Sequence, residues 1–136
     1  MDDTFFKPTS LTTKMYDEKI LKRVKNIKYT GEMKNADAVG EVINSHCGDI
    51  MEIYLKIKKN KIDKIRFKTY GCLAAVVSTD CMCELAEGKT LDEAERITGE
   101  DIMNTLGGKF PPLKIHCTAL SLKALKKAIK NYRKRN

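Results

Sequence analysis

Three of the five cysteines in the 136-residue chain are candidate metal ligands, and two of them stand close to another side chain that can bind a metal ion. Cys47 precedes Asp49 by two residues in the segment HCGD, and Cys72 follows a Tyr-Gly pair. Cys117 directly follows His116 in the segment KFPPLKIHCTALS. Thiolate sulfurs combined with an imidazole nitrogen or a carboxylate oxygen suit zinc or an iron–sulfur cluster. The residue types therefore indicate a metal site with three sulfur ligands and one nitrogen or oxygen ligand.

The spacing of these cysteines leaves a second interpretation open. No two of the three form a Cys-x-x-Cys pair, so neither a zinc-ribbon nor a ferredoxin spacing applies. A single cysteine is more often an inert buried residue than a ligand. From spacing alone, a metal site and three structural thiols are both compatible with the sequence.

The other two cysteines, Cys81 and Cys83, lie within residues 73–87, whose pattern predicts a helix. Side chains two residues apart on a helix point in different directions, so these two thiols cannot chelate one ion. Cys83 shares a helical stripe with Cys72, but at about 1.5 Å per residue the two are roughly 16 Å apart along the axis. Both are predicted to be small buried residues.

The strands that position the first two site cysteines follow from alternating apolar residues. A short strand is predicted at residues 39–44, and a β-hairpin at residues 50–70 has its turn at Lys59-Asn60-Lys61. Cys47 precedes this hairpin and Cys72 follows it. Both cysteines therefore fall at junctions between elements, where a scaffold exposes reactive groups.

The rest of the chain is predicted to be mainly helical, so we expect one α+β domain over residues 1–136, in which a small antiparallel sheet of about three strands is covered on one face by helices. Cys72 and Cys117 fall near predicted helix N-termini, where the helix dipole favours the thiolate. A flexible tail is predicted at 1–13, followed by a first helix that Thr12 or Thr13 caps and whose apolar stripe is Tyr16, Ile20, Val24 and Ile27. A helix at 73–87 comes next, and two capping boxes, Thr90 with Glu93 and Thr98 with Asp101, each mark the start of a short helix. The second short helix is predicted to stop at Gly107-Gly108, and a final helix covers 118–132.

The net charge of +8 comes largely from lysines at residues 56–68 and from the tail after residue 123. Lysines that alternate with apolar residues are typical of the solvated face of a sheet, and an acidic protein partner is the next interpretation. Nucleic-acid binding is not expected, because no aromatic residues are interleaved among the lysines. No apolar run reaches the ~18 residues of a transmembrane helix, and the acidic start MDDTFFKPTS does not resemble a signal peptide. A cytoplasmic protein is expected.

Four segments of the chain together match one family. HCGDIM, IRFKTYGC, EGKTLDEAERI and FPPLKIHC occur in this order. From about Tyr16 to Tyr132 the chain therefore resembles the U-type iron–sulfur cluster scaffold proteins, the IscU and NifU amino-terminal family. The resemblance implies the fold of that family and a site on one end of the domain, made of Cys47, Asp49, Cys72, His116 and Cys117.

The resemblance also implies a function. Members of the family take sulfur from a pyridoxal-phosphate cysteine desulfurase, combine it with iron into a [2Fe–2S] cluster, and pass the cluster to recipient apoproteins. By this resemblance Cys117 is the persulfide acceptor, and Asp49 makes the cluster labile, because a carboxylate is a harder partner than a thiolate. Either His116 or Asp49 could be the fourth ligand, and the protein could be a monomer or a homodimer bridged by the cluster.

Three stretches differ from the usual family pattern. The segment Phe110-Pro111-Pro112-Leu113-Lys114 replaces the Leu-Pro-Pro-Val-Lys that an Hsp70-type chaperone recognises in the family, so it is a candidate chaperone site. Lys114 is expected near the metal site, where its charge could offset anionic thiolates. The bulkier run Leu73-Ala74-Ala75 replaces small residues after Cys72, and the usual Asn-Pro motif after the first helix is missing.

Two alternatives to the scaffold are compatible with the same ligands. The first is a zinc-dependent sulfur acceptor, a sulfurtransferase that works with a cysteine desulfurase. The zinc branch of the family carries an insertion between the second and third site cysteines, whereas the interval from Cys72 to Cys117 has the shorter scaffold form. The second is a structural zinc domain that binds nucleic acid. Zinc can occupy the same ligands in either case.

Overall fold

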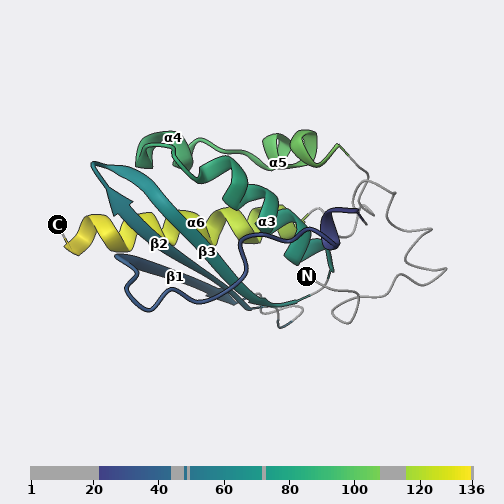
Figure 1. The fold of residues 1–136 in the computed structure, drawn as a ribbon, viewed down its shortest axis with the longest axis horizontal. Helices are drawn as coiled ribbons and strands as arrows, with labels where there is room; N and C mark the ends of the chain where they lie inside the picture. Colours follow the sequence, from purple (N-terminus) through teal and green to yellow (C-terminus); the bar gives the residue numbers. More distant parts are fainter. Residues whose placement is uncertain (1–21, 44–47, 49, 72, 108–115, 136) are drawn as a thin grey trace.

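The sheet has three antiparallel strands in the order β1-β2-β3, as shown in Figure 1. They are β1 (Ala38–Ile43), β2 (Ile50–Lys58) and β3 (Lys61–Tyr70). In the computed structural model the described residues are 22–43, 48, 50–71, 73–107 and 116–135. The predicted tail, the cap at Thr12 or Thr13 and most of the first helix lie outside them, and of that helix residues 22–24 are described as helical. The predicted strand and hairpin are confirmed.

The β2–β3 hairpin closes with a two-residue turn. Lys59 and Asn60 both have left-handed backbone conformations, with φ of 53° and 62°. Two successive positive φ values match the right-handed twist of the flanking strands, which is why such turns dominate tight hairpins. The turn was predicted in the correct place, but it is one residue shorter, because Lys61 already belongs to β3.

The helices are α3 (Leu73–Ala86), α4 (Leu91–Glu95), α5 (Gly99–Leu106) and α6 (His116–Arg135). Both predicted capping boxes are present, with Thr90 and Thr98 as the N-cap residues. At the end of α5, Gly107 takes a left-handed conformation and donates its N–H to Met103 O. Within the described part of the chain, no helix is long and apolar enough to cross a membrane.

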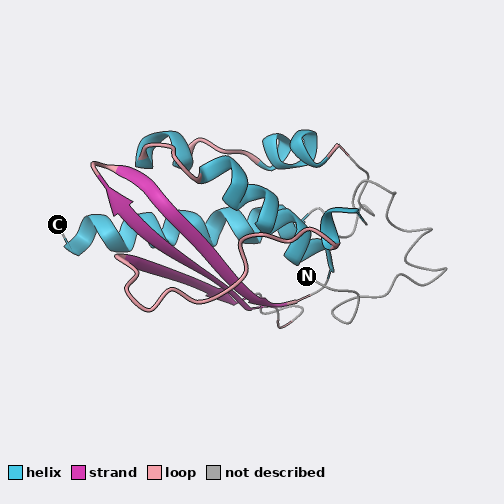
Figure 2. Cartoon of the chain, viewed as in Figure 1, coloured by secondary structure: helices cyan, strands magenta, loops and turns pink. Residues whose placement is uncertain are grey.

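The helices lie on one face of the sheet, as Figure 2 shows, and the predicted fold class is confirmed. Alternate residues of β2 point into the core and are buried, with Met51, Ile53 and Leu55 fully so. The residues between them, such as Lys56, lie on the opposite face, where Lys68 of β3 also projects. The lysines of the hairpin therefore occupy a solvated sheet face, as their alternation predicted.

The backbone of α6 lies directly against β1 at Gly40. A Cβ atom on Gly40 would stand 2.3 Å from Ala124 O and 2.5 Å from Ala128 N of α6. Because real Cβ atoms do not approach backbone atoms so closely, only glycine permits this contact. The absence of a side chain at Gly40 therefore sets the distance between helix and sheet.

Three side chains of α6 bind the carbonyl groups along the free edge of the sheet. Lys127 donates to Glu41 O at 2.9 Å, Asn131 to Val39 O at 2.8 Å and Arg135 to Asp37 O at 2.7 Å. The donors are four residues apart, so they follow one face of the helix, while the acceptors are two residues apart along the strand. The bonded carbonyls are not available to another strand, which protects this edge against unwanted pairing.

The segment before β1 is fastened to α3 by Asp80, whose side chain is fully buried. Its carboxylate accepts hydrogen bonds from Nε and Nη2 of Arg23 at 3.2 and 3.1 Å. It also accepts the backbone N–H groups of Lys28 and Tyr29, each at 2.9 Å. Next along the chain, Tyr29 O accepts the N–H of Phe67, so the segment also covers part of the β3 edge. One carboxylate thus orders the chain between the first helix and the sheet.

Replacement of Gly40 by alanine tests the contact between α6 and β1. We expect Gly40→Ala to lower the free energy of unfolding by about 3 kcal/mol, because the new methyl group overlaps helix backbone that cannot move aside alone. Urea denaturation measures this change. The matched control is Val39→Ala at the neighbouring exposed position, which should cost less than about 1 kcal/mol. Equal losses in the two variants would contradict this packing.

Replacement of Asp80 tests the fastening of the preceding segment. Asp80→Ala leaves the partly buried Arg23 and two backbone N–H groups without their acceptor, so we expect a loss of roughly 3–5 kcal/mol in unfolding free energy. Amide hydrogen exchange at Lys28 and Tyr29 should become faster than in the unaltered protein. Glu84→Ala removes only the exposed partner of Arg23 and should cost at most about 1 kcal/mol. Unchanged amide exchange in Asp80→Ala would show that Asp80 does not hold the segment.

Candidate metal-cluster site

The strands next to the predicted ligands in the sequence begin or end at the same end of the sheet. Ile50, the first residue of β2, pairs with Ile43 at the end of β1 and with Tyr70 at the end of β3. Cys47 and Asp49 belong to the chain between β1 and β2, and Cys72 is the residue between Gly71 and the start of α3. In Figure 1 the hairpin turn and the C-terminal end of α6 lie at the opposite end of the domain.

The third predicted cysteine lies at the start of α6. His116 and Cys117 are the first two residues of this helix, so the prediction that Cys117 precedes the final helix is wrong. The predicted range 118–132 falls short of the observed helix by two residues at the start and three at the end, because a sequence pattern locates helix ends only to within a few residues. The first turn of α6 meets α5, because a Cβ on Gly99 would lie 2.9 Å from Thr118 Oγ1.

A buried hydroxyl joins the three elements that contain or directly follow the predicted ligands. Thr79 of α3 lies with its Oγ1 2.6 Å from Ser121 Oγ of α6 and 3.5 Å from Met51 Sδ of β2. All three residues are fully buried. Thus β2 and α3, which follow Asp49 and Cys72 in the sequence, and α6, whose first turn contains Cys117, meet at one point in the core.

The side chains of the predicted ligands lie outside the part of the chain that the structure describes. Among residues 22–43, 48, 50–71, 73–107 and 116–135, no three His, Cys, Asp or Glu side chains are gathered closely enough to hold a metal ion. The cluster ligands therefore stay predictions that rest on the residue types and on the elements around them. The predicted residues outside the description are Cys47, Asp49, Cys72, Phe110, Pro111, Pro112, Leu113 and Lys114, together with the side chains of His116 and Cys117.

The two cysteines of α3 are buried, as predicted. Cys81 and Cys83 are both fully excluded from solvent. The Cys81 thiol donates a hydrogen bond to Ile102 O, with 3.6 Å between sulfur and oxygen. Burial raises the pKa of the Cys81 thiol to about 11 and raises the pKa of Cys83 well above its ordinary value. Both groups therefore stay protonated at neutral pH, and a protonated thiol is neither a good metal ligand nor a nucleophile.

An apolar row on the open face of the sheet was not predicted. Ile43, Ile50 and Tyr70 occupy one register row at the end of the sheet that carries the predicted site. Ile43 and Tyr70 are each 59% exposed, which is unusual for large apolar side chains. Lys68 Nζ lies 5.7 Å from the Tyr70 ring centre and pairs with Glu32 at 2.6 Å, which raises the pKa of Lys68. Only the strand register, which long-range pairing determines, brings these residues together.

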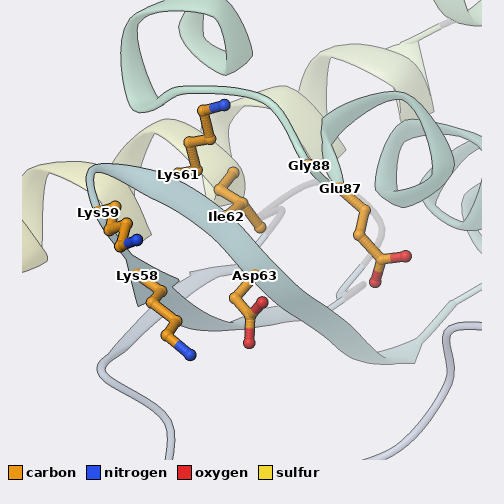
Figure 3. A pocket seen from close by; sticks show the side chains of 7 residues that line it. All are labelled: Lys58, Lys59, Lys61, Ile62, Asp63, Glu87 and Gly88. Atoms are coloured by element: carbon orange, nitrogen blue, oxygen red, sulfur yellow. The ribbon is translucent and has the colours of Figure 1, made fainter.

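The open pocket shown in Figure 3 lies away from this site. It has a volume of about 330 Å³ and lies at the hairpin turn, where β2 ends and β3 begins. Its lining carries charges of both signs, and no predicted ligand belongs to it. The lining residues are Lys58, Lys59, Lys61, Ile62, Asp63, Glu87 and Gly88.

Alkylation tests the assignment of the α3 cysteines. At pH 8 the raised pKa values leave almost no thiolate at Cys81 and Cys83, and only a thiolate reacts quickly with iodoacetamide. We expect peptide mass spectrometry to find both residues unmodified in the folded protein and modified in urea. Fast labelling of either one in the folded protein would contradict its burial.

Comparison with known proteins identifies relatives over most of the chain. The family model for the NifU-like N terminal domain matches residues 15–136. The iron-sulfur cluster assembly scaffold protein IscU 1 of Archaeoglobus fulgidus is 42% identical over 122 residues, which are 90% of this chain and 79% of that protein. The iron-sulfur cluster assembly scaffold protein IscU of Escherichia coli K12 is 38% identical over 122 residues, or 87% of this chain and 94% of that protein.

Solved structures agree with the fold. A putative iron-sulfur cluster assembly scaffold protein for the SUF system from Fervidobacterium islandicum superposes with a TM-score of 0.70 at 28% identity, covering 87% of this chain and 98% of that one. The N-terminal part of a NifU-like protein from Brucella abortus gives a TM-score of 0.74 at 20% identity, covering 93% and 100%. The second likeness supports the three-stranded fold alone.

Proposed function

Since the chain belongs to the NifU-like N-terminal domain family, we propose that it is a scaffold on which an iron–sulfur cluster is assembled and from which the cluster passes to recipient apoproteins. The observation that carries this proposal is the identity of 38–42% with IscU scaffold proteins over about nine-tenths of the chain. The meeting of β2, α3 and α6 at Thr79 supports it, because β2 and α3 follow predicted ligands in the sequence and α6 contains two of them in its first turn.

We propose a [2Fe–2S] cluster with Cys47, Cys72 and Cys117 as sulfur ligands. A cluster of this kind has four terminal ligand positions, so one further donor is needed, and either Asp49 or His116 supplies it. An oxygen or nitrogen donor binds less well than a fourth thiolate would. Such a ligand set suits a cluster that is handed on, whereas four cysteines suit permanent storage.

The start of α6 suits the sulfur-accepting role proposed for Cys117. This helix has 20 residues, and the positive end of its dipole lies at its first turn, where it favours a thiolate. The Cys117 thiolate would attack the outer sulfur of a persulfide on a cysteine desulfurase. The new S–S bond forms on Cys117, and the cysteine of the desulfurase leaves as a thiolate.

The apolar row of Ile43, Ile50 and Tyr70, in which Ile43 and Tyr70 are largely exposed, gives a partner protein a surface beside the proposed site. Exposed apolar groups next to one another mark interaction sites more often than single ones do. A cysteine desulfurase or a recipient apoprotein could dock on this row. Its own cysteine would then lie at the end of the sheet whose strands directly precede or follow Cys47, Asp49 and Cys72 in the sequence. An Hsp70-type chaperone acting on residues 110–114 is a separate proposal that rests on the sequence alone.

No observation favours the zinc-dependent sulfurtransferase over the scaffold. The relatives are scaffold proteins by name, and the chain has the short interval between its second and third site cysteines. Zinc in a purified sample would not separate the two functions, because empty thiolate sites bind zinc readily. The sulfurtransferase therefore remains one of the outcomes of the following test.

Anaerobic reconstitution tests the scaffold. With ferrous iron, cysteine and a cysteine desulfurase, we expect the protein to gain a visible chromophore with iron and acid-labile sulfide in equal amounts. Cys72→Ser and Cys117→Ser should each lose most of it, because serine is a poor cluster ligand. The matched control is Cys83→Ala, which removes a buried thiol outside the proposed ligand set and should keep the cluster.

Two outcomes would contradict the proposal. Tight zinc with a persulfide on one cysteine and no iron cluster would establish the sulfurtransferase instead. A cluster that survives in Cys72→Ser and Cys117→Ser but not in Cys83→Ala would place the ligands elsewhere in the chain. Metal and labile-sulfide analysis of the same samples separates these outcomes.

A further inference from the structure

We infer that Thr79 and Ser121 are positioning residues for the cluster site, because their buried hydrogen bond fixes where the start of α6 lies relative to α3. The inference rests on the proposed function, since that function makes Cys72 and Cys117 ligands of one cluster. Neither residue is a ligand, and each acts through the helix that carries it. The consequence concerns how tightly metal is held and how fast the cluster is lost.

The hydrogen bond joins two helices that are far apart in the sequence. Thr79 Oγ1 and Ser121 Oγ are 2.6 Å apart, and both residues are fully excluded from solvent. Thr79 Oγ1 also lies 2.6 Å from Ala75 O, one turn earlier in α3. The hydroxyl of Thr79 is therefore held between its own helix and α6, and its direction is set by both.

This bond lies within one or two helical turns of Cys72 and Cys117, so it can affect where these two proposed ligands lie. Ser121 follows Cys117 by four residues on α6, which is one turn or about 6 Å. Thr79 is the seventh residue of α3, about 9 Å along the axis from Leu73, the residue that follows Cys72. A helix moves as a stiff body over one or two turns, so a shift of α6 at Ser121 moves Cys117 as well.

Apolar packing alone would define this spacing less sharply. Contacts between aliphatic side chains are not directional, and such surfaces can slide by fractions of an ångström at little cost. A short hydrogen bond between two hydroxyls has a preferred distance and angle. The thioether of Met51, 3.5 Å from Thr79 Oγ1, extends the contact to the second residue of β2. The bond thus relates to one another three elements that contain or directly follow the proposed ligands.

The neighbouring Ser78 provides a matched comparison. Its side chain is also fully buried, but its Oγ lies 2.6 Å from Ala74 O and 3.4 Å from Ala75 O, both in its own helix. Loss of the Ser78 hydroxyl removes a buried polar group from α3 without touching α6. An effect that Thr79 and Ser121 share and that Ser78 lacks is therefore expected to come from the contact between the helices.

The test uses Thr79→Val and Ser121→Ala, singly and together, with Ser78→Ala as the control. Cobalt(II) binding, followed by thiolate-to-cobalt charge-transfer absorbance, reports the metal affinity without sulfur chemistry. Loss of the reconstituted cluster to an iron chelator reports its lability. We expect about fivefold weaker cobalt binding and about fivefold faster cluster loss in each single variant, below the 10–100-fold typical of groups that touch a ligand directly.

The pattern among the variants identifies a shared bond. The double variant should be little worse than either single one, because the second substitution removes a bond that the first has already broken. Thr79→Ser keeps the hydroxyl and should restore most of the cobalt affinity. Ser78→Ala should leave cobalt affinity and cluster loss unchanged, even if urea denaturation shows that it lowers stability.

The contrary results fall into two kinds. If the unaltered protein binds neither cobalt through thiolates nor an iron cluster, the proposed function fails, and this inference fails with it. If the unaltered protein binds both, and Thr79→Val and Ser121→Ala match Ser78→Ala in affinity and lability, the inference alone is wrong. Additive effects in the double variant would also overturn it, since they would show two independent roles.

Discussion

The contact between α6 and β1 at Gly40 sets the arrangement on which the rest of the domain depends. Because Gly40 has no side chain, helix backbone lies against strand backbone, and a methyl group there would stand 2.3 Å from Ala124 O. The regularly spaced hydrogen bonds from α6 to the carbonyls of β1 hold the helix along this edge. Since α6 begins at His116, a contact on β1 helps to determine where Cys117 enters the fold.

The proposed site combines a stiff frame with ligands at the ends of elements. The sheet, α3 and α6 are joined by backbone pairing, apolar packing and the hydroxyl contact of Thr79, while the proposed ligands fall between elements or in a first helical turn. This division suits a protein that must bind a cluster and then release it. The frame brings the donor atoms together, and the weakest donor, an oxygen or a nitrogen, allows the cluster to leave.

Features within one element or one hairpin could be predicted from the sequence. Both capping boxes, the three strands, the burial of Cys81 and Cys83 and the helices on one sheet face follow from residue type and periodicity. The start of α6 was predicted two residues late, because a sequence pattern locates helix ends only to within a few residues. The ligand set was inferred from residue types and resemblance, and it stays a prediction.

Contacts between residues far apart in the sequence could not be predicted. Asp80 binds backbone groups 51 and 52 residues away, and Thr79 meets Ser121 at a separation of 42 residues. Nothing in the local pattern distinguishes Asp80 or Thr79 from other polar residues of α3. The exposed row of Ile43 and Tyr70 likewise depends on strand register, which is a property of the whole sheet.

The most direct test of the account is Mössbauer spectroscopy of protein reconstituted anaerobically with iron-57. Three cysteine ligands and one oxygen or nitrogen ligand on a [2Fe–2S] cluster make the two irons chemically different, because one has two thiolates and the other has one. A cluster with this ligand set should give two quadrupole doublets of equal area, with parameters of a diamagnetic [2Fe–2S] centre. A single doublet from equivalent irons, or the spectrum of mononuclear iron alone, would contradict it.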